Sequence, residues 1–223
     1  MKYRKSILAL ILVLALMLSM ATLLSSCGTK ENEPEANGGS GQEENTEETT
    51  KKIIYRLTSE RTNYIRIQIK NCGIVVFELA PDVAPETVAW FQDLVAADYY
   101  NDSKFHRIAK DSYAEGGIPK NTDLMGTLPS LSKETVASPI SLANGVVAIL
   151  HDEESGSANG KFFICTGDGV THDKPYTAIG KVVDGWDALE KLNSALSVEG
   201  APVGNLEMLE VRFVYPDPVG GHK

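Results

Sequence analysis

The alternation of hydrophobic and polar residues is clearest between residues 64 and 79. Tyr64-Ile65-Arg66-Ile67-Gln68-Ile69 alternates with a period of two, and residues 74–79 follow as a second apolar run. Between them, Asn71-Cys72-Gly73 has the length and the glycine typical of a bulged hairpin turn. The sequence therefore predicts an antiparallel β-hairpin here.

A helical period replaces the alternation in two places. After Asp82 and Pro85, which mark a helix start, apolar residues recur on one helical face at Val88, Phe91, Leu94 and Val95. We expect this helix to end near residue 98. A second amphipathic helix is predicted over residues 186–195.

Several short apolar runs bounded by turn residues predict further strands. They lie at residues 104–108, 112–117, 145–150, 162–166 and 209–213. Residues 118–144 are rich in Pro, Ser, Thr and Asn, so we expect a long loop with one or two strands. Many short strands with only two helices make the chain mainly β and favour a closed antiparallel barrel over a parallel sheet.

The first 26 residues do not belong to this pattern. Three of the first five residues are basic, and an apolar stretch follows at residues 6–18. This is typical of a secretory signal, which takes no part in the fold. A membrane-spanning helix is the alternative, but Ser19 and Thr22 interrupt the stretch, and a span needs about 20 apolar residues.

Leu24-Ser25-Ser26-Cys27 lies directly behind the apolar stretch and resembles a bacterial lipobox. In a lipobox the cysteine is diacylated and becomes the first residue after cleavage, and two acyl chains suffice for stable anchoring. We therefore expect a lipoprotein signal peptide over residues 1–26 and a lipidated Cys27. The protein would then be anchored at the extracytoplasmic face of the bacterial cell membrane.

Residues 27–52 form an acidic tether in this interpretation. Between residues 30 and 50 there are seven glutamates against one lysine. Such a segment cannot bury enough apolar surface to offset its chain entropy, so we expect it to be disordered. Residues 53–217 are enough for one domain with a real core, followed by a short tail at 218–223.

Charge and cysteine usage exclude several classes of function. The net charge of −9 argues against binding to nucleic acid. With Cys27 assigned to lipid, Cys72 in a turn and Cys165 in a strand are expected to be independent thiols, although an exported protein permits a disulfide. Neither the cysteine spacing nor the four scattered histidines predicts a metal site. We expect a monomer.

Three sequence blocks resemble the cyclophilin-type peptidyl-prolyl isomerases. They are Phe105-His106-Arg107-Ile108 with Glu115-Gly116-Gly117, then Gly160-Lys161-Phe162-Phe163-Ile164-Cys165-Thr166, then Tyr176-Thr177-Ala178-Ile179-Gly180-Lys181-Val182-Val183-Asp184-Gly185. Their order and spacing match the family over about residues 64–215. The resemblance implies an eight-stranded antiparallel barrel with one helix over each open end, and an active groove built from the first two blocks.

The resemblance also implies a mechanism. Rotation about a peptide bond has a barrier of about 18–20 kcal/mol, and an enzyme can lower it without a metal or cofactor by fixing the proline and stabilising the twisted nitrogen. Arg107 matches the catalytic arginine and Phe163 the aromatic wall of the proline pocket. The alternative for Arg107 is a structural salt bridge. We expect His106 to pack beneath the groove and Phe162 to lie in the core, because strand neighbours point to opposite faces.

Several groove positions depart from the family pattern. Glu115 and Lys161 stand where glutamine is usual, Thr171 replaces a rim tryptophan, Tyr176 replaces a histidine, and Ser112-Tyr113 replaces Phe-Met. Leu150-His151-Asp152 takes the place of Ala-Asn-Ala. The expected substrate-binding residues are Phe163, Tyr113, Glu115, Leu150, His151, Lys161, Thr171 and Tyr176.

The predicted function follows from the anchor and the groove together. We expect a peptidyl-prolyl isomerase, slow or specialised, that acts on proline-containing segments of exported proteins as they fold near the membrane. The alternative is a non-catalytic module that binds proline peptides in the same groove.

Overall fold

The structure is a computed structural model, and it describes residues 53–136 and 139–219. The expected signal peptide, Cys27, the whole of the acidic tether and residues 220–223 of the expected tail lie outside the described residues. Within the described ranges, no helix is long and apolar enough to cross a membrane.

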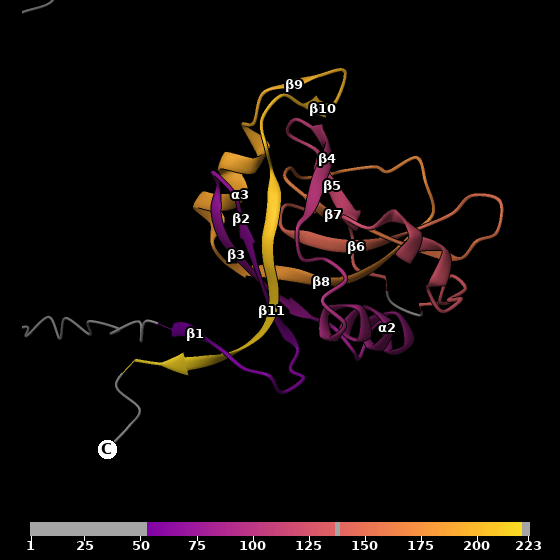
Figure 1. The fold of residues 1–223 in the computed structure, drawn as a ribbon, viewed down its shortest axis with the longest axis horizontal. Coiled ribbons are helices and arrows are strands. Elements are labelled where there is room, and N and C mark those ends of the chain that lie inside the picture. The colour runs from indigo at the N-terminus through magenta and orange to yellow at the C-terminus, as the bar shows by residue number, and fades with distance from the viewer. Residues whose placement is uncertain (1–52, 137–138, 220–223) are drawn as a thin grey trace, which may run out of the picture. The chain divides into compact units, whose positions relative to one another are not determined.

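Eight antiparallel strands form a closed barrel (Figure 1). Their order is β11-β2-β3-β8-β6-β7-β5-β4, and β4 closes the circle by pairing with β11 at Lys104↔Glu207 and Ser103↔Met208. The predicted barrel is confirmed. The barrel strands are β2 (Tyr64–Ile69), β3 (Gly73–Leu79), β4 (Ser103–Ala109), β5 (Tyr113–Ile118), β6 (Val146–His151), β7 (Ala158–Cys165), β8 (Tyr176–Asp184) and β11 (Glu207–Pro218).

Three further strands lie outside the barrel. Strand β1 (Ile53–Leu57) pairs with the second half of β11, from Ile53↔Pro218 to Leu57↔Val214. This pairing makes β11 longer than the predicted 209–213, and neither β1 nor the extension was predicted. A small hairpin, β9 (Ser197–Val198) and β10 (Ala201–Pro202), precedes β11.

The described part of the loop at 118–144 contains a 3-10 helix, η1 (Thr122–Thr127), and an isolated bridge between Ser132 and Ser157. The expected strands are absent from its described residues, so that prediction is wrong. Some backbone groups of this loop are bonded to side chains: the Asn121 side chain accepts from the N–H of Asp123 at 3.1 Å.

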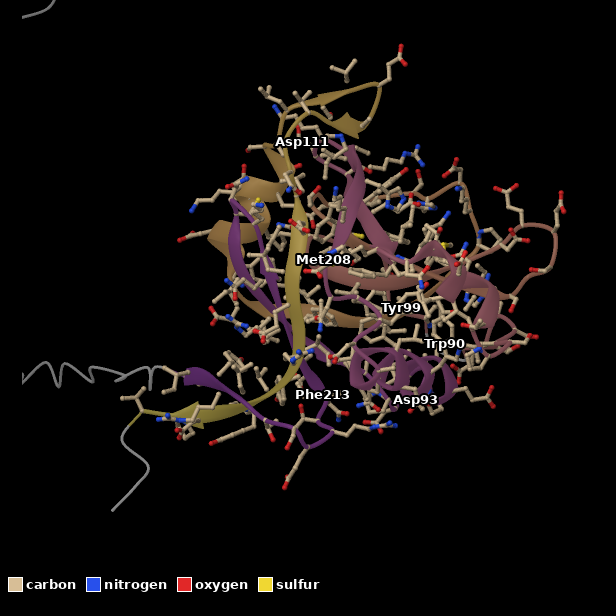
Figure 2. All side chains as sticks on the ribbon, viewed as in Figure 1. Trp90, Asp93, Tyr99, Asp111, Met208 and Phe213 are labelled. Atoms are coloured by element: carbon tan, nitrogen blue, oxygen red, sulfur yellow. The ribbon has the colours of Figure 1, made fainter. Side chains whose placement is uncertain are left out.

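Two α-helices lie at different ends of the barrel (Figure 1). Helix α2 (Pro85–Ala96) begins at the predicted proline, whose missing N–H costs nothing in the first turn. Its free N–H groups are capped from the loop: Glu134 accepts from the backbone N–H of Glu86 at 3.2 Å and of Thr87 at 2.9 Å. Trp90, which is labelled in Figure 2, joins the same helix to the loop by donating to the Pro129 carbonyl at 3.0 Å.

Helix α3 (Trp186–Asn193) is two residues shorter than predicted. It is joined to the turn between β4 and β5 by a reciprocal pair of hydrogen bonds. The side chain of Asn193 accepts from the N–H of Asp111 at 2.8 Å and donates to its carboxylate at 3.0 Å. This turn leads into the two strands that carry the first family block.

The barrel wall separates two hydrophobic clusters. Successive side chains of a strand point to opposite faces of the wall. In β2 the alternate residues Ile65, Ile67 and Ile69 are therefore buried inside the barrel. The interior cluster centres on Phe162, whose ring contacts Phe91 at 6.0 Å and Tyr100 at 5.4 Å between centroids. The groove-face cluster lies on the other side of the wall and consists of Tyr113, Leu142, Val146, Ala148, Leu150, Phe163, Cys165, Val170 and Ala178.

Cys72 and Cys165 are free and buried, as expected for independent thiols. Burial raises the pKa of Cys165 to about 12. The thiol of Cys165 is therefore un-ionised, and inert as a nucleophile, at neutral pH.

Candidate functional site

A row of directly paired residues crosses five neighbouring strands on the groove face. Arg107 on β4 pairs with Glu115 on β5, which pairs with Phe163 on β7. Ala148 on β6 and Ala178 on β8 continue the row. Directly opposed residues share a face of the sheet. The register therefore brings the expected catalytic arginine and the expected proline-pocket aromatic to one surface, with Glu115 between them.

Strand β4 is irregular at the expected catalytic arginine. Phe105 pairs with Gly116 and Arg107 with Glu115, so His106 is an extra residue in the strand. An extra residue of this kind breaks the alternation of side chains. The expectation that His106 packs beneath the groove is therefore wrong: its Nε2 contacts Glu115 Oε1 at 3.0 Å.

Two glycines allow β5 to lie close to its neighbours. A Cβ on Gly117 would come within 2.7 Å of the Gly160 carbonyl, and its φ of +94° is one that residues with a side chain rarely adopt. A Cβ on Gly116 would meet the side chain of Met208 at 2.7 Å. Glycine is thus required at 117, where the obstacle is backbone and φ is positive, whereas at 116 the flexible end of Met208 would have to move.

Glu115 is a buried carboxylate, with only 3% of its side chain exposed. Its Oε1 accepts from His106, while its Oε2 is buried without a hydrogen-bond partner in the described structure. Burial opposes ionisation of this group, but the His106 and His172 rings beside it outweigh burial and hold the pKa of Glu115 well below its usual range. Glu115 is therefore a fixed negative charge in the groove.

Arg107 lies partly in solvent, with 41% of its side chain exposed. Its Nη1 is 3.8 Å from Glu115 Oε2, and its Cζ is 5.3 Å from the centroid of the Tyr113 ring. The first contact is an ion pair longer than a hydrogen bond, and the second is a cation–π contact. Both contacts orient the guanidinium.

The aromatic side chains of the site pack tightly against one another. The ring of His172 stacks on Phe163, with centroids 4.6 Å apart and an angle of 12° between the planes. It also contacts Tyr113 at 4.6 Å, while Tyr176 meets Phe163 edge-on at 5.7 Å. Both Phe163 and the His172 side chain are fully buried. We call these four residues (Tyr113, Phe163, His172 and Tyr176) the Phe163 cluster.

Sequence reasoning missed His172. It lies in the loop between β7 and β8, where no periodicity assigns a residue to a face. The only available signal was its position directly after Thr171, which was expected at the rim of the groove.

The other predicted substrate-binding residues divide into two groups. Thr171 is exposed, and Lys161 and Tyr176 are half-buried. Leu150 and His151 are fully buried, and present no surface to a peptide in this structure. His151 Nδ1 donates to the Gly156 carbonyl at 3.2 Å, so its Nε2 accepts from the Thr177 hydroxyl at 2.9 Å. Burial lowers the pKa of His151, as expected for a neutral structural histidine.

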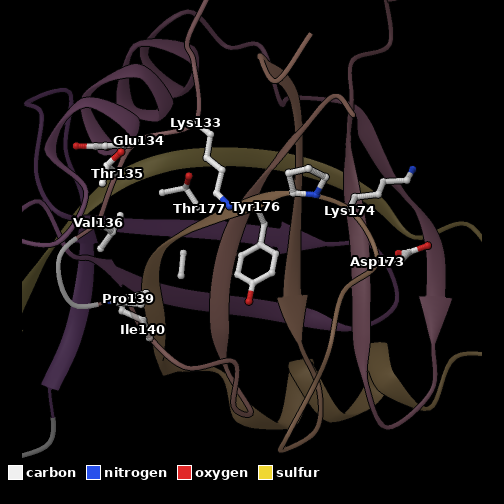
Figure 3. A pocket seen from close by; sticks show the side chains of 12 residues that line it. Lys133, Glu134, Thr135, Val136, Pro139, Ile140, Asp173, Lys174, Tyr176 and Thr177 are labelled. Carbon is white, nitrogen blue, oxygen red and sulfur yellow. The ribbon is translucent and has the colours of Figure 1, made fainter. Parts of the chain in front are cut away.

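A cavity of about 700 Å³ adjoins the Phe163 cluster at Tyr176 (Figure 3). The loop before β6 forms one side of it, with Lys133, Pro139 and Ile140, and β8 forms the other, with Tyr176 and Ala178. Figure 3 shows the Tyr176 side chain projecting from the ribbon among these residues. Tyr176 therefore belongs both to the Phe163 cluster and to the cavity wall.

Among residues 53–136 and 139–219, no group of three His, Cys, Asp or Glu side chains is arranged to hold a metal ion. The chemistry available at the site is that of a cationic donor fixed beside an aromatic surface.

Comparison with known proteins agrees with this geometry. The sequence profile of the cyclophilin type peptidyl-prolyl cis-trans isomerase/CLD family matches residues 64–213. A probable peptidyl-prolyl cis-trans isomerase of Brucella suis is 34% identical over 155 residues, covering 64% of this chain and 78% of the relative. Peptidyl-prolyl cis-trans isomerase B of Bacillus subtilis is 27% identical over 135 residues, covering 60% and 92%.

The fold also matches a solved structure. The crystal structure of a Cryptosporidium parvum cyclophilin-type isomerase superposes with a TM-score of 0.59 at 21% identity, covering 70% of this chain and 99% of that one. At this identity the match shows the fold alone, and the family follows from the profile, which covers more than half of the chain. The chain belongs to the cyclophilin-type peptidyl-prolyl cis-trans isomerase family.

Proposed function

We propose that this isomerase acts on proline-containing segments of exported polypeptides at the outer face of a bacterial membrane, with Arg107 as its catalytic residue. The catalytic role of Arg107 is supported by the strand register, which places Arg107, Glu115 and Phe163 in one row across β4, β5 and β7. It sets a cationic donor and an apolar ring on one face, two strands apart.

The geometry of Arg107 fits the demand of the reaction. In the twisted transition state the proline nitrogen loses its conjugation with the carbonyl, and its lone pair becomes a better acceptor than in either planar isomer. A donor held near that nitrogen stabilises the transition state more than the ground state. Arg107 can act in this way because Tyr113 and Glu115 already orient it.

Glu115 supports this role by charge rather than by contact with the peptide. Its carboxylate is buried and stays ionised at neutral pH, because the neighbouring histidine rings lower its pKa. A fixed negative charge 3.8 Å from Nη1 restrains the guanidinium at one end. The same carboxylate also competes with the peptide for the donors of Arg107, which favours a slower enzyme.

A relative of the same fold supports the choice of ligand. The Cryptosporidium parvum isomerase has also been solved in the presence of the dipeptide Ala-Pro, with a TM-score of 0.57 and 22% identity to this chain. For this chain we propose the same ligand chemistry, an X-Pro unit with its ring on Phe163.

The proposed location rests on the sequence before residue 28. The basic start, the apolar stretch and Leu24-Ser25-Ser26-Cys27 favour export and lipidation at Cys27. Together with the acidic tether, they would hold the barrel near the membrane, where newly exported chains fold.

The test is the rate of exchange between cis and trans isomers of an Ala-Pro peptide, measured by NMR exchange spectroscopy with the purified protein. The proposal expects exchange faster than the uncatalysed process, which takes tens of seconds or longer. Binding of the peptide without faster exchange would instead support the non-catalytic module.

A further inference from the structure

The ring of His172 occupies the face of Phe163. It lies nearly parallel to Phe163 at 4.6 Å, the spacing of two stacked rings, and its side chain is completely buried. The ring of Tyr113 also packs against the imidazole, with centroids 4.6 Å apart. A proline ring stacked on this face of Phe163 would have to take the same space.

The hydrogen bonds of His172 define which of its nitrogens carries the proton. The backbone N–H of Lys174 donates to Nδ1 at 3.1 Å, so Nδ1 is an acceptor and the proton of the neutral ring is on Nε2. That Nε2 is buried and has no hydrogen-bond partner in the described structure. It points toward Glu115 Oε2, which also lacks one, across 3.9 Å.

The closed arrangement thus combines good ring packing with two unsatisfied polar atoms. Buried polar groups without a partner are rare in folded proteins and are costly to keep. Rotation of His172 toward solvent would hydrate Nε2. It would also let Glu115 Oε2 accept a hydrogen bond from water or from Arg107, whose Nη1 lies 3.8 Å away. The packing that is lost could be replaced by any apolar ring of similar size.

We propose that His172 is a gate of the proline site: its imidazole covers Phe163 in the free protein and rotates away when a prolyl residue takes its place. This inference rests on the proposed function, since it concerns the same site. It makes His172 a specificity-determining residue, because a ligand binds only if its ring packs on Phe163 and Tyr113 better than the imidazole does.

The surroundings of His172 permit this motion. It lies in the connection between β7 and β8, outside any helix or strand, and both of its neighbours, Thr171 and Asp173, are exposed. One backbone hydrogen bond, two ring contacts and a 3.5 Å contact between Nδ1 and the Asp173 carboxylate hold the imidazole.

A pair of substitutions tests the gate in opposite directions. His172→Ala removes the ring and leaves Phe163 open, whereas His172→Phe keeps a stacked ring that has no polar atom to satisfy. If the free protein is open about one tenth of the time, His172→Ala should lower the apparent dissociation constant of an Ala-Pro peptide about tenfold. His172→Phe should raise it above that of the wild type. Lys181→Ala, an exposed change on β8, is the control and should leave it unchanged.

Binding is measured by calorimetric titration of the full-length protein, and exchange spectroscopy is run on the same samples. Tighter binding by His172→Ala without faster exchange would uphold the gate and count against the isomerase. If the wild type is catalytically active and His172→Ala binds the peptide more weakly, the isomerase is upheld and the gate is refuted. His172 would then be a wall of the site that contacts the ligand. Absence of binding by both proteins would also overturn the gate, since the opened site should bind.

A second measurement needs no variant. In the wild-type protein the ring protons of His172 should be shifted upfield by the stacked ring of Phe163. Saturation with the peptide should return them toward the position of a solvent-exposed histidine. Ring protons that stay upfield in the peptide-saturated protein would contradict the proposal.

Discussion

Replacement of Arg107 by alanine should separate catalysis from folding. A transition-state donor that is removed costs about 3–4 kcal/mol, or a factor of about 10²–10³ in rate. We expect Arg107→Ala to lose nearly all acceleration of X-Pro exchange and yet to keep the barrel folded.

The expected loss of stability is small because of where Arg107 lies. Its ion pair with Glu115 is 3.8 Å long and its side chain is 41% exposed. At that distance two unit charges attract by about 1 kcal/mol in water, and exposed pairs measure about 0.2–1 kcal/mol. The cation–π contact with Tyr113 adds about 0.5–1 kcal/mol. Glu115 still keeps its hydrogen bond from His106, so the substitution leaves no bare buried charge.

The assay is exchange spectroscopy on an Ala-Pro peptide, with scanning calorimetry on the same samples. Arg107→Lys is the matched variant, because it keeps the charge but loses the planar fork of donors; we expect an intermediate rate. Equal rates for the wild type and Arg107→Ala would refute the catalytic role. A cooperative unfolding transition lost in Arg107→Ala would instead show that the arginine is structural.

Three further predictions concern the groove, the anchor and the core. Glu115→Gln should raise the exchange rate severalfold, because a neutral amide competes less for the donors of Arg107; a lower rate would contradict this. Because the pKa of Glu115 is lowered, its contribution to stability is present above the unfolded value of about 4.3 and is lost only as the pH falls below it. Its carboxyl carbon should therefore keep the NMR shift of an ionised group down to pH 4. Cys27→Ser should abolish partitioning of the protein into detergent, and partitioning that persists without lipid on Cys27 would favour a spanning helix. Phe162→Ala should lower the free energy of unfolding by about 3–5 kcal/mol in urea denaturation, and a loss below 1 kcal/mol would show that the interior cluster is not centred there.

The features that the sequence predicted well are those with a local cause. The hairpin at 64–79 follows from alternation, and the start of α2 follows from Pro85 at its first turn. Arg107 and Phe163 were expected on one surface because of a family resemblance, and the strand register now explains why they meet.

The features that were missed depend on contacts distant in sequence. Glu134 caps α2 from 47 residues away, which no helix signal near Pro85 reveals. Strand β1 is held by the far end of β11 and lacks alternation of its own. His106 was assigned to the wrong face because regular alternation was assumed, and only pairing with β5 shows the extra residue in β4. His172 is positioned by the rings on which it packs, and not by its own loop.

The division of the barrel wall into two clusters explains how such a groove can change while the fold persists. Phe162 and Phe163 are adjacent, but Phe162 packs in the interior cluster against α2 and Phe163 packs in the groove-face cluster. A substitution in the groove-face cluster, such as one at Tyr113, therefore removes contacts only from the second cluster. Interior packing, which supplies most of the apolar burial, is unaffected. Selection can then adjust the gate residue, the rim and the charge beside Arg107 independently of the barrel, and the activity of this protein is to be sought in those positions rather than in its fold.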